Sequence, residues 1–133
     1  MDELFGDVWG EGWWPGRSQS GFSPRIDVYY CGGEPPRAIV KVDLAGVRME
    51  TINLEISGRE LVISGERPVQ ETEGRVYQQV EIEAGPFRRV VELNADVVAD
   101  AARATYEDGV LRVELPLSTA SDSIRQVPIE QGE

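Results

Sequence analysis

The chain has 133 residues and a mass of 14.7 kDa, enough for one domain with a single hydrophobic core. Its 41% of hydrophobic and 28% of charged residues are typical of a globular protein. The net charge of −11 excludes general binding to nucleic-acid phosphates or to anionic membranes. The chain has no histidine, and Cys31 is its only cysteine. Histidine-based catalysis, intrachain disulfides and cysteine-rich zinc sites are therefore excluded.

Residues 1–24 are predicted to form a flexible N-terminal arm, because glycine and proline interrupt any regular element there. The arm is also rich in aromatic residues, namely Phe5, Trp9, Trp13, Trp14 and Phe22. These rings could tuck onto the core of their own domain, or they could form an apolar arm that contacts other molecules. Their density favours the second interpretation, in which they bind clients.

The first ten residues carry acids where a signal peptide would carry bases. No apolar stretch in the sequence is long enough to span a membrane. We therefore expect a soluble cytoplasmic protein.

From residue 24 to residue 117, apolar and polar residues alternate with the period of two that is typical of β-strands. The predicted strands cover residues 26–29, 38–44, 52–56, 61–63, 87–93, 102–106 and 110–115. The Asp108-Gly109 pair between the last two is a strong hairpin signal. Only residues 96–102 could be helical. The pattern predicts an all-β fold, an immunoglobulin-like antiparallel β-sandwich.

The segment between Gly65 and Phe87 is longer than a sandwich connection requires, and it is highly charged. The strand-like run Val76–Val80 lies in its middle. This run is predicted to be a strand that pairs with something other than its neighbours in the sequence.

Residues 118–133 form a polar tail with one apolar island, Val127-Pro128-Ile129. Proline keeps this backbone extended, so the two flanking β-branched side chains project to the same side, one strand pitch apart. Such a pair fits two neighbouring holes at the edge of a sandwich, although this tripeptide can also occur by chance.

The motifs of nucleotide-binding enzymes are missing, since no glycine-rich loop precedes Lys-Ser or Lys-Thr. A pair of catalytic carboxylates, or a calcium site from Asp96 and Asp100, is disfavoured because neither a cleft nor a suitable loop spacing is indicated. We expect no enzymatic activity, no cofactor and no metal, and we look for function in apolar surfaces and strand edges.

Four short motifs resemble those of the α-crystallin domain of the small heat-shock proteins. The matching residues are Asp43, Leu44, Gly46 and Val47, then Ile63–Arg67, then Ala104, Gly109, Val110, Leu111, Val113, Leu115 and Pro116, and finally Val127 and Ile129. The resemblance covers residues 24–129. Ala45 and Asn94 stand where the family has prolines, Ala102 where a larger aliphatic residue is common, and the arm is short for the family.

The resemblance implies an arm at residues 1–24, an α-crystallin domain at residues 25–117 and a C-terminal extension at residues 118–133. It implies a homodimer made by strand exchange, and larger homo-oligomers held by the tail. The exchange would use Val76, Tyr77, Gln78, Gln79 and Val80 against Ile26, Val28 and Tyr30 of a partner, with Arg89 near the interface. The tail motif Val127, Pro128 and Ile129 would enter a neighbour's groove lined by Ile52, Leu54, Ile56, Ala102 and Ala104. Core packing is the alternative for the groove residues, and a surface ion pair is the alternative for Arg89.

The function that the resemblance implies is that of an ATP-independent holdase, a stress-response chaperone that binds unfolding proteins and prevents their aggregation. Two alternatives remain at this point. One is a β-sandwich module that binds carbohydrate or protein, and the other is a co-chaperone of the related p23-like type.

Overall fold

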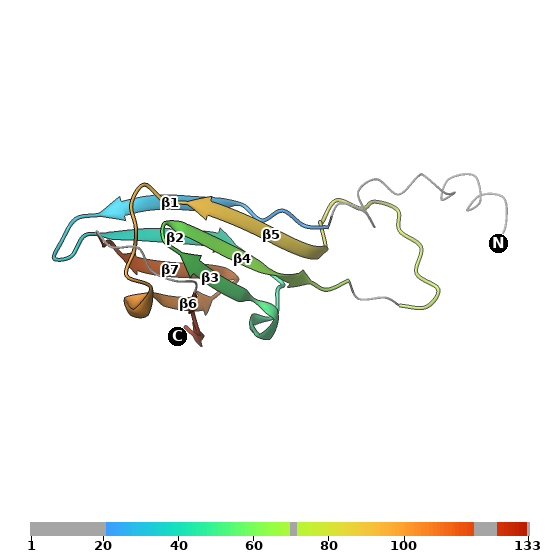
Figure 1. The fold of residues 1–133 in the computed structure, drawn as a ribbon. Coiled ribbons are helices and arrows are strands. Elements are labelled where there is room, and N and C mark those ends of the chain that lie inside the picture. The colour runs from blue at the N-terminus through green and yellow to red at the C-terminus, as the bar shows by residue number, and fades with distance from the viewer. Residues whose placement is uncertain (1–20, 70–71, 119–124, 133) are drawn as a thin grey trace.

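The fold is described from a computed structural model, for residues 21–69, 72–118 and 125–132. Two β-sheets pack face to face (Figure 1). The strands are β1 (Ile26–Cys31), β2 (Arg37–Asp43), β3 (Asn53–Ser57), β4 (Glu60–Arg67), β5 (Gly85–Glu92), β6 (Arg103–Glu107), β7 (Val110–Pro116), β8 (Arg125–Gln126) and β9 (Ile129–Gln131). One sheet has the order β1-β2-β7-β6-β9 and the other β5-β4-β3-β8. The predicted all-β sandwich is confirmed.

The strands follow from the alternating pattern, because every second side chain of a strand points between the sheets. In β7, for example, Leu111, Val113 and Leu115 are fully buried. The hairpin between β6 and β7 turns at Asp108 and Gly109, whose φ angles are 55° and 80°. The Asp-Gly sequence suits this turn, since both positions are left-handed. Almost all pairings are antiparallel, but β9 pairs with β6 in parallel.

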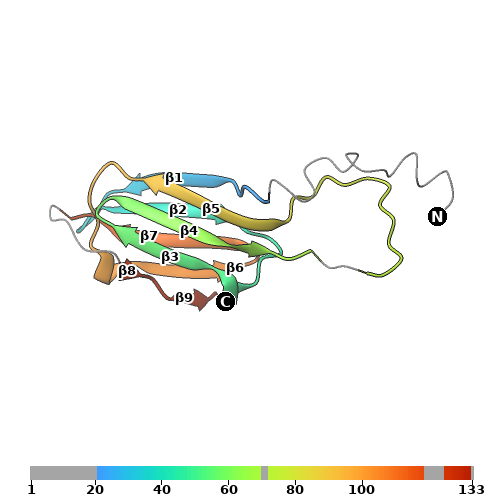
Figure 2. The same ribbon diagram turned by 45° about the vertical axis from the view of Figure 1, so that its right-hand side comes forward.

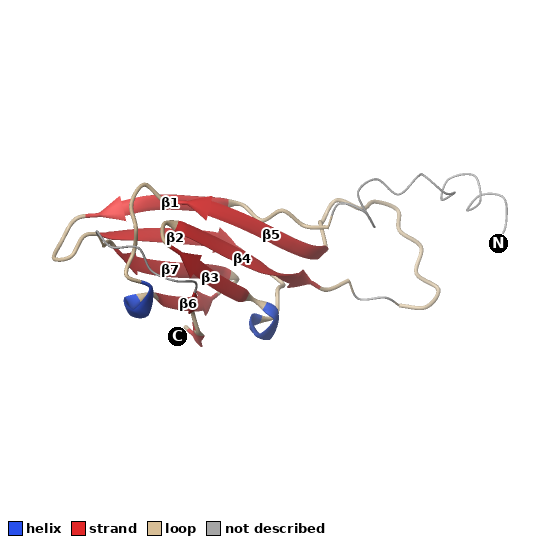
Figure 3. Cartoon of the chain, in the orientation of Figure 1, coloured by secondary structure: helices blue, strands red, loops and turns tan. Residues whose placement is uncertain are grey.

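Residues 76–80, predicted to pair with something other than their neighbours in the sequence, form no strand within this chain. The loop that carries them projects beyond the end of the sandwich (Figure 1), and no described strand lies beside it there. The short helical turns differ from the sequence prediction. In the predicted helical segment 96–102, only Ala99–Ala101 forms a 3₁₀ turn, η2. A second 3₁₀ turn, η1 (Met49–Thr51), was not predicted. Figure 3 shows both turns as short blue helices in an otherwise all-strand domain.

Candidate functional site

One long side of the sandwich is closed by the C-terminal tail. The short strand β8 pairs with β3, with Glu55 opposite Gln126 and Ile56 opposite Arg125. The tail then crosses to the other sheet, where β9 pairs with β6 and Ile129 lies opposite Ala104. Figure 2 shows β8 and β9 along this side of the domain. The tail therefore extends both sheets at once.

The side chains of the tail motif enter the space between the sheets. Val127 is only 6% exposed, and its N–H donates to the carbonyl of Leu54 at 3.1 Å. Ile129 packs against the same core and is half-buried, whereas Pro128 faces solvent. Both β-branched side chains therefore point inward, and the proline between them does not.

The structure brings the predicted tail and the predicted groove together, within one chain. The groove residues Ile52, Leu54, Ile56 and Ala104 are buried and belong to the core, and Ala102 packs against it. They line the groove and fill the core at the same time. The resemblance implies docking of the tail in a neighbour's groove, and the structure of the single chain describes the tail in its own groove.

Tyr106 fastens the β6 end of this closed side, and the sequence analysis missed it. Its hydroxyl lies 2.6 Å from the carbonyl oxygen of Leu44 and 2.7 Å from that of Val47, and its own carbonyl accepts from Gly132 at 3.0 Å. Burial raises the pKa of Tyr106, although the hydrogen bond to Val47 and the charge of Arg67 oppose this. The signal in the sequence was a tyrosine within the predicted strand 102–106, since a tyrosine buried there needs a partner for its hydroxyl.

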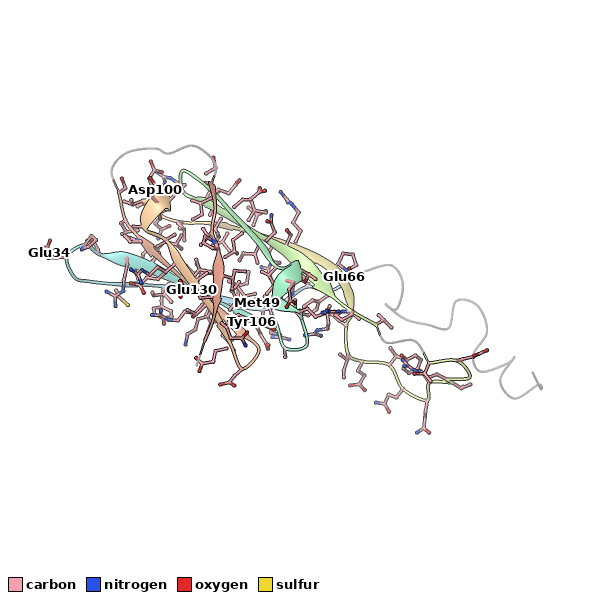
Figure 4. The ribbon with its side chains drawn as sticks, turned by 90° about the horizontal axis from the view of Figure 1, so that it is seen from below. Glu34, Met49, Glu66, Asp100, Tyr106 and Glu130 are labelled. Carbon is pink, nitrogen blue, oxygen red and sulfur yellow. The ribbon has the colours of Figure 1, made fainter. Side chains whose placement is uncertain are left out.

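Figure 4 views the molecule from below, where the labelled Met49, Tyr106 and Glu130 lie near one another. A hollow on this side is lined by η1, by the start of β3 and by the tail. The lining residues are Met49, Glu50, Ile52, Asn53, Leu54, Val127, Pro128 and Ile129. The tail therefore forms one wall of this hollow, and η1 with the start of β3 forms the other wall.

The opposite long side of the sandwich is open. β1 is an edge strand that pairs only with β2 among the described strands, and its middle residues are exposed. Most of the large apolar side chains exposed in the described residues lie on β1, on the loop 68–84 and on β5. They are Val28, Tyr29, Tyr30, Val69, Val76, Ile82 and Val90. The remaining exposed large apolar residue of the described ranges is Val110, on β7. Ile82 is 81% exposed. An unpaired edge beside exposed apolar residues is a typical surface for pairing with another chain.

The predicted strand-exchange residues lie apart in the single chain. Val76–Val80 are in the projecting loop, where Arg75 donates to the hydroxyl of Tyr77. Arg89 lies opposite Ile63 and donates to the carbonyl of Pro24, so it joins β5 to the start of β1. This contact differs from the surface ion pair considered for Arg89. Tyr30 accepts from the N–H of Asn94 at 2.8 Å, which fastens the other end of β1.

Of the predicted client-binding arm, Phe5, Trp9, Trp13 and Trp14 lie outside the described residues. Phe22 is described, and it is buried, with 7% of its surface exposed. Its ring packs on Phe87 inside the sandwich. In this conformation Phe22 is a core residue and does not present its ring to solvent, so its role in client binding stays a prediction. Nothing in the sequence marked its socket, because the walls come from residues more than forty positions away.

Within the described ranges, no helix is long and apolar enough to cross a membrane. In the same part of the chain, no three Cys, Asp or Glu side chains gather as metal ligands would. The geometry is that of a β-sandwich whose candidate sites are strand edges and apolar surfaces.

The comparisons with known proteins agree on the family. The sequence model described as "Hsp20/alpha crystallin family" matches residues 34–130. Because this match covers more than half of the chain, the chain belongs to the Hsp20/alpha crystallin family. This is a family of small heat-shock chaperones, so membership supports a chaperone role in general and gives no sign of enzymatic activity.

Three similar proteins illustrate the match. Heat shock protein 16 of Schizosaccharomyces pombe is 32% identical over 112 residues, which are 81% of this chain and 76% of that protein. The 16.9 kDa class I heat shock protein 1 of Triticum aestivum is 38% identical over 86 residues, 62% of this chain. The match spans only 57% of that wheat protein's length. The solved structure of heat shock protein 16.0 from Schizosaccharomyces pombe has a TM-score of 0.64 at 32% identity and covers 82% of this chain and 99% of that one.

Proposed function

We propose that this chain is an ATP-independent holdase, which binds unfolding proteins through exposed apolar surfaces and keeps them from aggregating. The observation that carries the proposal is the gathering of exposed apolar side chains on β1, β5 and the loop 68–84. A monomeric soluble protein rarely exposes such a set without an interaction partner. The net charge of −11 would keep a complex with an unfolded client in solution.

The first partner in this proposal is a second copy of the chain. The segment Val76–Val80 of each copy adds to the free edge of β1 in the other, by β-augmentation. Two features support this exchange: no described strand pairs with the outer edge of β1, and the loop carries its β-competent run away from its own sandwich. The contact is reciprocal, so it closes a twofold dimer.

The second contact between copies uses the tail. A neighbour's tail can make the same contacts as the chain's own tail, because the groove is formed by β3, β6 and the residues just before each strand, and the tail is not part of it. Burying Val127 and Ile129 contributes roughly 1.5–3 kcal/mol each, and ordering the tail offsets much of this. A single docked tail is therefore weak, and larger homo-oligomers need several tails together.

In this proposal the arm tryptophans Trp9, Trp13 and Trp14, with Phe5, contact clients, since large rings on a glycine-rich backbone adapt to irregular partners. The protein works in the cytoplasm and needs no nucleotide. Membership in the heat-shock family favours this proposal over the carbohydrate-binding module and the p23-like co-chaperone.

The test is the suppression of aggregation of a heat-labile client enzyme, followed by light scattering. We expect the pure protein to suppress scattering equally with and without millimolar ATP. We expect Ile82→Ser to weaken suppression, while Val110→Ser, which removes the exposed apolar residue on β7, serves as the matched control. A protein that suppresses no aggregation, or only with ATP, would contradict the proposal.

A further inference from the structure

Phe22 is buried against Phe87, whose strand β5 begins where the loop 68–84 ends, and we call the site around its ring the socket. Figure 1 shows this loop projecting from that end of the sandwich. Its ring meets the ring of Phe87 edge to face, with centroids 5.5 Å apart and planes at 83°. The guanidinium of Arg67 lies over the same ring, 3.7 Å from its centroid. The N–H of Phe22 donates to the carbonyl of Pro86 at 3.1 Å. Both ring contacts depend on the charge distribution of an aromatic ring, so the socket selects aromatic over aliphatic side chains.

The walls of the socket are held in place without Phe22. They belong to β4 and β5, which pair from Glu60↔Glu92 to Arg67↔Gly85. Gly65 lets the Phe87 ring lie against β4, since a Cβ there would come within 2.9 Å of that ring. Arg67 is fixed by its own hydrogen bonds, from Nε to the carbonyl of Ala45 at 3.0 Å and from a terminal nitrogen to that of Glu83 at 2.7 Å. The socket is therefore preformed.

Phe22 is held by contacts that lie outside the pairing of β4 with β5. It precedes β1 and follows Gly21, whose φ of +67° favours glycine. The N–H of Phe22 donates to the carbonyl of Pro86, and the N–H of Ser23 donates to Glu83 at 3.3 Å. The carbonyl of Pro24 accepts from Arg89. The pairing of β4 with β5 does not depend on these contacts, and withdrawal of the segment would uncover the ring of Phe87.

We propose that this socket is a client-binding site, which takes an aromatic side chain of an unfolded polypeptide when Phe22 withdraws. The segment Gly21–Pro24 is then the resident occupant, and it shows the chemistry that the site accepts: one aromatic ring and a backbone N–H that donates to the carbonyl of Pro86. The proposal rests on the proposed holdase function and names a surface for it. An unfolded protein exposes aromatic rings that its folded state buries, so the socket discriminates between the two states.

The direct test is ¹⁹F NMR on the full chain labelled with 4-fluorophenylalanine. The sequence has three phenylalanines, so three signals are expected, and Phe5→Leu and Phe22→Leu assign them. The client is reduced α-lactalbumin, and aggregation suppression is measured on the same samples. When the client is held, we expect the Phe22 signal to move to the position of an exposed ring. A client held with an unmoved Phe22 signal overturns the socket and leaves the holdase function standing, whereas failure to hold the client overturns the function itself.

A peptide competition gives a second, independent readout. We expect the peptide acetyl-Gly-Phe-Ser-Pro-amide to shift the Phe87 signal of Phe22→Ala, and to bind that variant about tenfold or more tightly than the wild type, whose resident ring competes. The matched peptide with leucine in place of phenylalanine should bind far more weakly. Equal binding of the two peptides contradicts the proposal. Should Phe22→Ala not fold, the same comparison is made on Phe22→Leu. A Phe22 signal that moves on dilution without client would assign the socket to exchange between copies, and would overturn the client assignment.

Discussion

The two long sides of the sandwich differ in what covers them. On one side, β8 and β9 extend both sheets, and Val127 becomes part of the core. On the other, β1 has an edge that no described strand covers, and the residues around it expose apolar side chains. The two sides differ because the tail runs along one of them, whereas the loop 68–84 does not run along the other. The tail returns to the groove of its own chain, whereas the loop 68–84 projects away from its own β1 (Figure 2). Among the described residues, β1 has the edge that the chain leaves uncovered, and this is the edge that we propose a partner covers.

The largest expected effect is on the open side. Deleting residues 70–82 removes the segment proposed for exchange, and it should convert dimers into monomers, because β1 then has nothing to pair with. Replacing Val76–Val80 by a Gly-Ser run of equal length is the matched control for loop length, and it should also give monomers. Sedimentation velocity measures both. Unchanged dimers in either variant would remove strand exchange from the account.

The next effect is on the closed side. Val127→Ala combined with Ile129→Ala should shift larger assemblies toward dimers without unfolding the domain, at very roughly 2–4 kcal/mol per docked tail. Circular dichroism follows the fold, and light scattering follows the size. Glu130→Ala, an exposed residue in the same tail, is the control and should change neither. A double variant with the size distribution of the wild type would show that the tail does not hold the assembly.

A smaller effect is expected from Arg89, which joins the two strands of the open side. Arg89→Leu leaves the Pro24 carbonyl without its charged donor, and it should lower the free energy of unfolding by roughly 1–3 kcal/mol. Arg88→Leu, the adjacent exposed arginine, should have little effect. Urea unfolding of the two variants measures the difference. Equal losses would contradict the role of Arg89 inside the sandwich.

The smallest effect concerns Tyr106 on the closed side. Its neutral hydroxyl bonds to backbone carbonyls, and burial raises its pKa above the ordinary 10.0. The stability from this hydroxyl is fully present below pH 10 and is lost as the pH rises through the raised pKa. Tyr106→Phe should cost about 1 kcal/mol at neutral pH and remove part of the alkaline loss. Urea unfolding at neutral and alkaline pH measures both effects. Tyr29→Phe, an exposed tyrosine, is the control. An unchanged alkaline profile in Tyr106→Phe would contradict this assignment.

The fold was largely predictable because each strand carries its own alternating signal. The hairpin at Asp108-Gly109 lies where the sequence places it. The run Val76–Val80 shows the limit of such local signals. It has the composition of a strand, yet composition does not say which edge it pairs with. No described strand of the same chain lies beside it, and its pairing with a partner stays a prediction.

The candidate site was predictable only in part, for the same physical reason. The tail and its groove were recognisable as motifs, but their meeting within one chain depends on the path of the backbone. The socket of Phe22 joins residues from the arm, β4 and β5, and no local pattern connects them. The hydroxyl of Tyr106 bonds β6 to carbonyls of the segment after β2, which are more than fifty positions away in the sequence.

The measurement that tests the central claim most directly is amide hydrogen exchange of the full chain, compared with the variant in which a Gly-Ser run replaces Val76–Val80. The claim is that the open edge of β1 is covered by a second copy. We predict that residues 26–31 and residues 76–80 are both protected in the wild type, and that β1 loses protection in the variant while β6 and β9 keep theirs. Rapid exchange of residues 76–80 in the wild type, with β1 equally protected in both proteins, would contradict the claim.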